Sequence, residues 1–306
     1  PRPSAGASRA VPPGADQLAD ADLPALWRDL GLPGLIDLHV HFMPKQVMDK
    51  VWAYFDAAGP LTGTPWPIAY RTEESDRLAR LRAMGVLRFS SLVYAHKPGM
   101  AAWLNAWATE FADQHADVLH TMTFYPEPGA LSYVLAGLAA GVQVVKVHVQ
   151  VGDFDPREPA LDEIWGVLAD ARVPIITHCG SGPAPGRFTG PAVFGEVLAR
   201  HPDLTAVVAH LGMPEYVEFL DLADRYPRVH LDTTMAFTDF AEARTPFPKE
   251  MRPRLLDLRE RIVFGSDFPN TPYAYAHQVE SLLRLELGDD WLRGVLHDNA
   301  QRVLEK

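Results

Sequence analysis

The chain has 306 residues, of which 47% are hydrophobic and 22% charged. This balance is typical of a globular protein with a large core and excludes a disordered or collagen-like chain. The formal net charge is −11, from 28 basic and 39 acidic side chains, and no long basic run interrupts it. A protein that binds the phosphate backbone needs the opposite charge, so we expect no nucleic-acid partner.

The compartment is indicated by one cysteine and by the lack of a long apolar run. Cys179 is the single cysteine, which excludes an internal disulfide framework and favours the reducing cytoplasm. The longest uncharged helix-like run, residues 131–145, is too short and too rich in glycine to cross a bilayer. We therefore expect a cytoplasmic protein with no membrane partner.

The N-terminal segment differs in composition from the remainder. Residues 1–20 are rich in Pro, Ala, Gly and Ser and contain no apolar core of a signal peptide. We expect a flexible leader and lead-in over residues 1–30, followed by one domain over residues 31–306.

Short apolar, β-branched runs alternate with helix-like segments from residue 35 onward. The predicted strands are residues 35–40, 86–93, 118–124, 142–149, 173–177, 204–209, 229–233 and 262–265. The predicted helices are residues 73–84, 101–115, 131–140, 161–171, 192–200, 214–225, 273–287 and 290–304. This alternation predicts an α/β protein with a parallel sheet, and eight strands favour a closed TIM-like (β/α)8 barrel. An open doubly wound sheet is the alternative, but it would carry a Gly-rich phosphate turn after the first strand, and none is present.

Polar residues that could bind a metal end four of these strands. The first strand ends in His39 and His41, whose side chains point to the same side because they are two residues apart. His178, His210 and Asp267 follow later strands, and the carboxyl ends of barrel strands share one rim. Imidazoles with one carboxylate suit zinc or another borderline first-row metal, manganese included. A histidine beside such an ion titrates in the range useful for proton transfer.

The order of these motifs resembles the amidohydrolase superfamily. The resemblance covers residues 35–304, and its most specific parts are the His-x-His pair and the segment Gly265-Ser266-Asp267-Phe268-Pro269. Within it, the chain is similar to the branch that holds aminocarboxymuconate-semialdehyde decarboxylase, γ-resorcylate decarboxylase and related metal-dependent hydrolases. The resemblance implies that His39, His41, His178 and Asp267 bind one metal ion. It also implies that His210 is an unligated acid/base and that Asp267 shares in proton transfer.

A second ion is the alternative at this site. Lys146 and His148 lie two residues apart on the fourth predicted strand, so both should point inward. In binuclear members of the superfamily a carboxylated lysine from this strand bridges two ions. We favour one ion, with Lys146 as a structural lysine one layer below His148 and with His148 lining the substrate pocket.

Two long connections at the same rim are candidate lids over a small-molecule substrate. They are residues 42–72, which are rich in aromatic side chains such as Trp66, and residues 235–251. Arg71 and Arg187 are the arginines nearest these rim segments and could bind a carboxylate. Trp103 and Trp107, four residues apart on a predicted helix, are expected in the core.

The sequence therefore predicts a metal-dependent hydrolase that uses a metal-activated water on an amide, lactone or related bond of a small molecule. A non-oxidative decarboxylase of an aromatic or unsaturated acid is the alternative, and a barrel that binds a metal or ligand without turnover is a third interpretation. For the assembly of the protein we consider a homodimer.

Overall fold

The computed structural model describes residues 17–305. Most of the predicted leader lies outside the described residues. The lead-in does not: helix α1, Leu23–Asp29, buries Leu23 and Trp27, and the Trp27 indole donates a hydrogen bond of 2.7 Å to the carbonyl of Met84. Residues 23–29 therefore belong to the packed body of the molecule.

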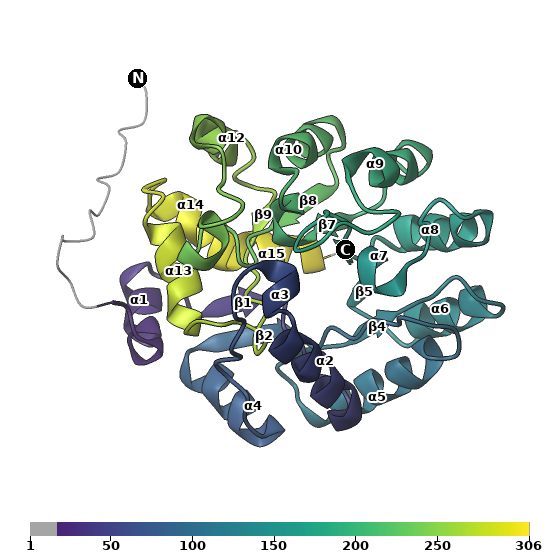
Figure 1. The fold of residues 1–306 in the computed structure, drawn as a ribbon, viewed down its shortest axis with the longest axis horizontal. Helices are drawn as coiled ribbons and strands as arrows, with labels where there is room; N and C mark the ends of the chain where they lie inside the picture. Colours follow the sequence, from purple (N-terminus) through teal and green to yellow (C-terminus); the bar gives the residue numbers. More distant parts are fainter. Residues whose placement is uncertain (1–16, 306) are drawn as a thin grey trace.

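The strands form a parallel barrel surrounded by helices (Figure 1). The strands are β1 Leu35–Asp37, β2 Val86–Ser90, β3 Val118–Leu119, β4 Thr121–Thr123, β5 Val144–His148, β6 Ile175–His178, β7 Ala206–Val208, β8 Val229–Asp232 and β9 Ile262–Val263. The third predicted strand is divided at His120, so that β3 pairs with β2 and β4 pairs with β5. Because β3 and β4 together occupy the place of one predicted strand, the nine strands fill the eight predicted positions of the barrel.

The barrel closes where the last strand meets the first. The amide of Leu38 donates to the carbonyl of Phe264 at 3.2 Å, and the amide of His41 donates to the carbonyl of Phe268 at 2.7 Å. The amide of Asp267 donates in turn to the carbonyl of His39 at 2.8 Å. Closure therefore places Asp267 directly beside the His-x-His pair.

Fifteen α-helices occur in the described residues. They are α1 Leu23–Asp29, α2 Lys45–Ala57, α3 Gly59–Thr62, α4 Glu74–Ala83, α5 Ala101–Gln114, α6 Ala130–Ala139, α7 Val149–Gly152, α8 Pro159–Ala171, α9 Pro191–Arg200, α10 Tyr216–Arg225, α11 Asp239–Glu242, α12 Arg252–Asp257, α13 Tyr275–Leu283, α14 Asp289–Arg293 and α15 Asn299–Leu304. In α8 the side chains of Leu161, Ile164, Trp165 and Leu168 are buried, a spacing that forms one apolar stripe facing the sheet. None of the described helices is long and apolar enough to span a membrane.

The strands are buried on both faces, as expected for a parallel sheet covered by helices. Val144, Val145 and Val147 of β5 are all buried. A second apolar cluster fills the barrel interior and includes Ile36, Ile176, Val207 and Val263. The barrel is thus a packed core whose upper rim is free to carry polar side chains.

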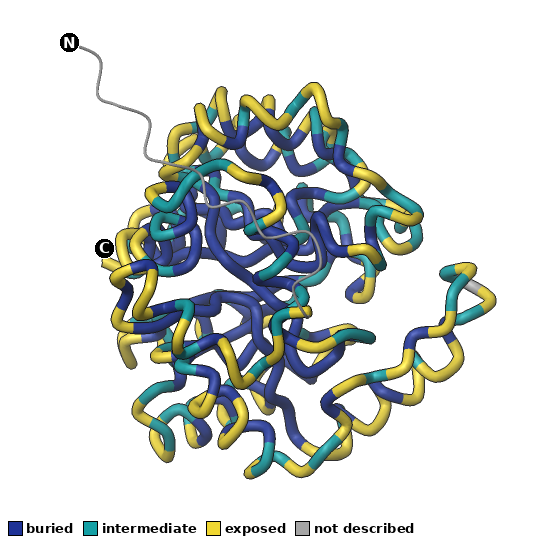
Figure 2. The backbone as a smooth tube through the Cα atoms, turned by 90° about the vertical axis from the view of Figure 1, so that its left-hand side faces the viewer, coloured by how far each residue is buried: buried dark blue, intermediate teal, exposed yellow. Residues whose placement is uncertain are grey.

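The two predicted rim loops contain helices that the sequence analysis missed. Residues 42–72 include α2 and α3, and residues 235–251 include α11. Helices α2 and α3 project from the barrel as an arm on the side of the rim (Figures 1 and 2). The predicted strand over residues 35–40 also ends early, at Asp37, and the chain turns there before His39.

Candidate metal centre and active site

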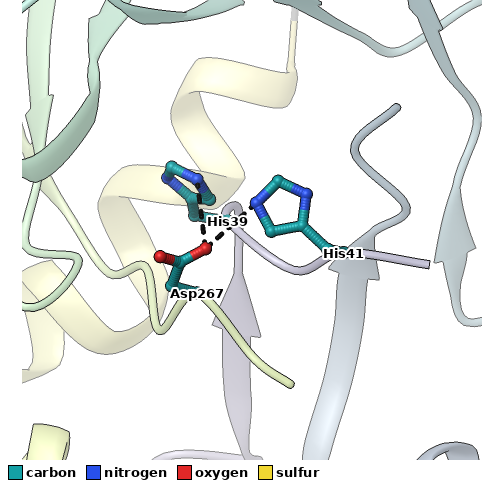
Figure 3. A group of neighbouring side chains, drawn as sticks. All are labelled: His39, His41 and Asp267. Carbon is teal, nitrogen blue, oxygen red and sulfur yellow. Dashed lines mark ion pairs between the residues drawn. The ribbon is translucent and has the colours of Figure 1, made fainter. Parts of the chain in front are cut away.

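His39, His41 and Asp267 come together at the carboxyl end of the barrel (Figure 3). One ligand atom from each of the three lies within 4.8 Å of the others. The Nε2 of His41 is 3.0 Å from Oδ1 of Asp267, and the Nε2 of His39 is 3.9 Å from the same oxygen. Both imidazoles therefore direct the same ring nitrogen at one carboxylate.

The second ring nitrogen of each histidine fixes this orientation. The Nδ1–H of His39 donates to Oδ2 of Asp232 at 2.8 Å, and the Nδ1–H of His41 donates to the carbonyl of Leu92 at 2.9 Å. In a neutral imidazole, Nε2 then carries a lone pair. A lone pair of His41 and a carboxylate oxygen of Asp267 thus face each other at 3.0 Å, an arrangement that a cation between them stabilises.

Asp232 is a functional residue that the sequence analysis did not identify. It ends β8, and besides holding His39 it accepts hydrogen bonds on Oδ1 from the amides of His210 (2.8 Å) and Thr234 (3.1 Å). The sequence did hold a signal for this residue, because Asp232 ends a buried strand as His178 does. Its carboxylate joins the first histidine to the segment that carries His210.

His210 lies beside the three-residue group without belonging to it. Its backbone has a φ of 58°, and its Nδ1–H donates to the carbonyl of Thr234 at 3.1 Å. Its ring centroid is 5.2 Å from that of His39 and 4.7 Å from that of His178. Burial, followed by the charge of His39, lowers the pKa of His210 to about 4, so its Nε2 is a free proton acceptor at neutral pH.

The other strand-end histidine, His178, uses its Nε2 elsewhere. This nitrogen donates to the carbonyl of Gly182 at 2.8 Å, and the ring stacks on His148 with a centroid distance of 3.9 Å. His178 is close enough to contact His210 but is not among the three residues whose ligand atoms converge. In this conformation only Nδ1 of His178 could bind an ion, so its role as a fourth ligand stays a prediction.

Lys146 reaches the site itself, although the sequence analysis placed it one layer below. The side chain is fully buried, and its Nζ donates to Nε2 of His39 at 3.3 Å. Burial lowers the pKa of Lys146 to about 8, opposed by the charges of Asp232 and Asp267. Because a metal ion would bind this same nitrogen of His39, the ion and Lys146 compete for it.

The electrostatics favour a charged Asp267. Burial by itself would raise the pKa of the Asp267 carboxyl, but the neighbouring imidazoles, that of His41 first, hold it well below its usual range. An ionised carboxylate and two oriented imidazoles form a donor set that fits a first-row divalent ion. The residues present are thus suited to a metal.

A family model described as amidohydrolase matches residues 36–306. The chain belongs to the amidohydrolase family. This confirms the expected family, and the fold is confirmed by solved structures that share the barrel. No curated protein is significantly similar in sequence.

Similar structures cover nearly the whole barrel at low sequence identity. An uncharacterised TIM-barrel protein from Bordetella bronchiseptica has a TM-score of 0.72 at 20% identity, covering 89% of this chain and 98% of its own. IDCase from Metarhizium anisopliae has a TM-score of 0.60 at 17% identity (90% and 98%). A probable 2-pyrone-4,6-dicarboxylic acid hydrolase from Acinetobacter baumannii has a TM-score of 0.59 at 11% identity (89% and 100%). At these identities the likeness shows the fold.

This amidohydrolase has a cavity of about 1100 Å³ above the candidate metal centre. Trp66 and His148, both predicted to bind substrate, line it. Arg71 and Arg187 do not, because each is exposed and held by a carboxylate: Arg71 by Asp56 at 2.7 Å and Arg187 by Asp153 at 2.8 Å. This geometry does not support substrate binding by the two arginines, which stays a prediction.

Large apolar side chains are exposed at the mouth of the cavity. Trp103, predicted to be a core residue, is 42% exposed and lines the cavity together with Tyr54 and Val151, which are 49% and 43% exposed. The partner residue Trp107 does pack inward, stacking on Phe111 with a centroid distance of 5.0 Å. The spacing of four residues predicts that Trp103 and Trp107 lie on one face of α5. It could not show that this face is covered at Trp107 and open to the cavity at Trp103.

The arm is attached to the loop that carries Asp267 through Asn270. The indole N–H of Trp52 donates to Oδ1 of Asn270 at 3.0 Å, and that of Trp66 donates to its carbonyl at 2.7 Å. The amide of Asn270 donates to the carbonyl of Asp267 at 2.8 Å. Trp52 of the arm and Trp66, which follows the arm, therefore both support the segment that positions the carboxylate.

Proposed function

We propose that the protein is a divalent-metal-dependent hydrolase that cleaves an amide, lactone or related bond in a small molecule. The observation that carries the proposal is the convergence of two oriented imidazole nitrogens on the carboxylate of Asp267, with the free Nε2 of His210 beside them. Membership of the amidohydrolase family supports it. The hydrolase among the similar structures is consistent with this reaction class.

A bound divalent ion would lower the pKa of water from about 16 towards ~7 and polarise the carbonyl of the substrate. His39, His41 and Asp267 would hold it, and His178 is the proposed fourth ligand. His210, neutral and with Nδ1–H committed to Thr234, can accept a proton at Nε2 and return it to the leaving group. Asp267 is the second proposed proton carrier, because its carboxylate lies at the same point.

We propose one ion, zinc in the first place and manganese in the second. The described residues contain a single group of three converging donors. Lys146, hydrogen-bonded to His39, would have to release that nitrogen when the ion binds. The binuclear alternative, with a carboxylated Lys146, is one outcome of the test.

The test combines metal analysis with turnover on one sample. We expect about one equivalent of zinc per chain, loss of turnover on chelation and its recovery with zinc. The substrates to screen are small-molecule amides and lactones, with incorporation of labelled oxygen from water as the readout of hydrolysis. Two equivalents of metal would reject the mononuclear site. Release of CO₂ without incorporation of water would replace hydrolysis by decarboxylation, and metal binding without any turnover would favour a non-catalytic barrel.

We also propose a compartment and an assembly. We propose a cytoplasmic protein because its single cysteine, Cys179, is buried and unpaired, as is usual where disulfides do not form. A homodimer stays a prediction, which analytical ultracentrifugation tests.

A further inference from the structure

The cavity above the metal centre is positively charged, although the whole chain carries a net charge of −11. Four cationic side chains line it, namely Lys50, Lys97, Lys146 and Arg244, against the single carboxylate of Asp267. Within residues 17–305, none of these four cations forms an ion pair. A cleft of this sign in an acidic protein concentrates anionic ligands.

Arg244 is the cation best prepared to bind an anion. It follows α11 on the rim segment over residues 235–251, and its Nε donates to Oγ1 of Thr64 at 3.2 Å. The guanidinium carbon lies 4.8 Å from the centroid of the Phe240 ring. Two contacts thus hold the guanidinium in one orientation before any ligand arrives.

One donor of this guanidinium is left without a partner. The Nη2 of Arg244 is buried and makes no hydrogen bond. Leaving a buried donor unpaired is unfavourable, and more so for a charged group, so such a group marks a place where a ligand is expected to supply the acceptor. A guanidinium presents parallel N–H donors that match the two oxygens of a carboxylate.

The remaining wall of the cavity fits an apolar body. Tyr54 of α2, Trp103 of α5 and Val151 of α7 are large apolar side chains that stay exposed at its mouth. Val47 and Val51, also on the arm, continue the same wall. Aromatic side chains around a cavity favour a flat ring system in contact with them.

We propose that the substrate is an amphipathic carboxylate, with a planar apolar ring against Trp103 and Tyr54 and a non-reacting carboxylate bound by Arg244. This rests on the proposed function for the position of the reacting bond. Arg244 comes from a rim segment and not from a strand end, so we place the carboxylate that it binds away from the reacting bond. Arg244 is then the residue that selects acids over neutral analogues, the role that the sequence analysis had assigned to Arg71 and Arg187.

The experiment compares two probes of the same shape, the anionic 2-naphthoate and the neutral 2-naphthamide, titrated into the zinc-loaded protein and followed by tryptophan fluorescence. We expect the acid to bind about 10–100-fold more tightly than the amide, the range for a charge-assisted pair. Arg244→Met should abolish that preference while leaving affinity for the amide unchanged. Arg80→Met, which removes an arginine paired with Asp76 on the outer helix α4, is the matched control and should keep the preference.

The outcomes separate the alternatives. If Arg244→Met keeps the preference for the acid, the carboxylate binds elsewhere, the metal ion included, and the proposal is wrong. Equal affinity of the two probes for the wild type, or no binding of either, would also overturn it. Should Arg244→Met fail to fold, Arg244→Lys carries the test, with an expected loss of at least about threefold for the acid alone. Because binding is measured without turnover, a missing hydrolase activity would reject the proposed function and leave this result standing.

Discussion

Both ring nitrogens of His39 are already committed in the structure, one to Asp232 and one to Lys146. Asp232 makes Nδ1 the donor and so presents the lone pair of Nε2 to the site, whereas Lys146 occupies that lone pair. A carboxylate behind a histidine ligand increases the basicity of the ring and fixes its orientation. The balance between these two neighbours should determine how tightly a metal binds.

Asp232→Asn should weaken metal binding by about 10–100-fold, because the amide carries no charge to support the imidazole of His39. Competition with a chelating dye measures the affinity. The matched control is Asp224→Asn, which removes an exposed carboxylate that pairs with Arg254. An affinity unchanged by Asp232→Asn would show that Asp232 acts on the fold and not on the ligand.

His210→Asn should retain the metal and lose most of the turnover, about 10²–10⁴-fold, because asparagine cannot accept a proton near neutral pH. Metal content and rate are measured on the same sample. His201→Asn, which replaces a histidine paired with Asp162 away from the cavity, serves as control and should be fully active. Loss of metal together with activity would make His210 a ligand, and full activity would remove it from the mechanism.

At the scale of elements, the two rim segments, residues 42–72 and residues 235–251, meet over the cavity. The ring of Trp66 lies 4.8 Å from that of Phe240, and its indole bonds the carbonyl of Asn270. Asn270 in turn is bonded to Asp267. The same tryptophan therefore links the two rim segments and supports the loop of the metal-binding carboxylate.

Trp66→Leu should raise the KM of a substrate more than it lowers kcat, because it loosens the cavity wall directly and acts on Asp267 only through Asn270. It should also speed proteolysis within residues 45–62, as contacts that hold the arm are lost. Steady-state kinetics and limited proteolysis measure the two effects. Trp66→Phe keeps a ring against Phe240 but has no N–H, so it separates packing from the hydrogen bond. A fall in kcat alone would refute the role of Trp66 in binding.

At the scale of the molecule, one partly buried histidine at the opposite end of the barrel should make stability depend on pH. Burial, with smaller contributions from the charges of Arg261, Arg228 and Arg302, lowers the pKa of His230 from 6.5 to about 4. Its Nδ1 has no hydrogen-bond partner. Between these two values the unfolded chain binds a proton that the native state does not, so the free energy of unfolding falls as the pH decreases.

His230→Gln should therefore flatten this dependence. Relative to the variant, the wild type should lose up to about 3 kcal/mol between pH 6.5 and 4, and nothing above pH 7. Urea unfolding at several pH values gives both curves. Parallel curves would show that His230 is protonated in the native state over this range.

The residue pattern by itself determined the class of fold and pointed to the three side chains that converge, whereas His178, the fourth predicted ligand, is not among them. Eight β-branched runs separated by helical segments can bury their apolar faces only in a closed or double-wound parallel sheet. The His-x-His spacing brought two imidazoles to one side of the chain, although β1 ends at Asp37, before both. Asp267 was recognisable because it, too, ends a buried strand. These features depend on neighbours in the chain, which a sequence displays directly.

Only the tertiary structure decided which side chains meet across strands. Barrel closure places Asp267 against His39. It also brings Asp232 of β8 and Lys146 of β5, two strands that do not pair with β1, to the two ring nitrogens of that histidine. Arg71 and Arg187 each pair with a carboxylate, whereas Arg244 keeps a buried donor without a partner. Such outcomes follow from contacts between segments far apart in the chain, and their energies depend on burial and geometry that no local pattern encodes.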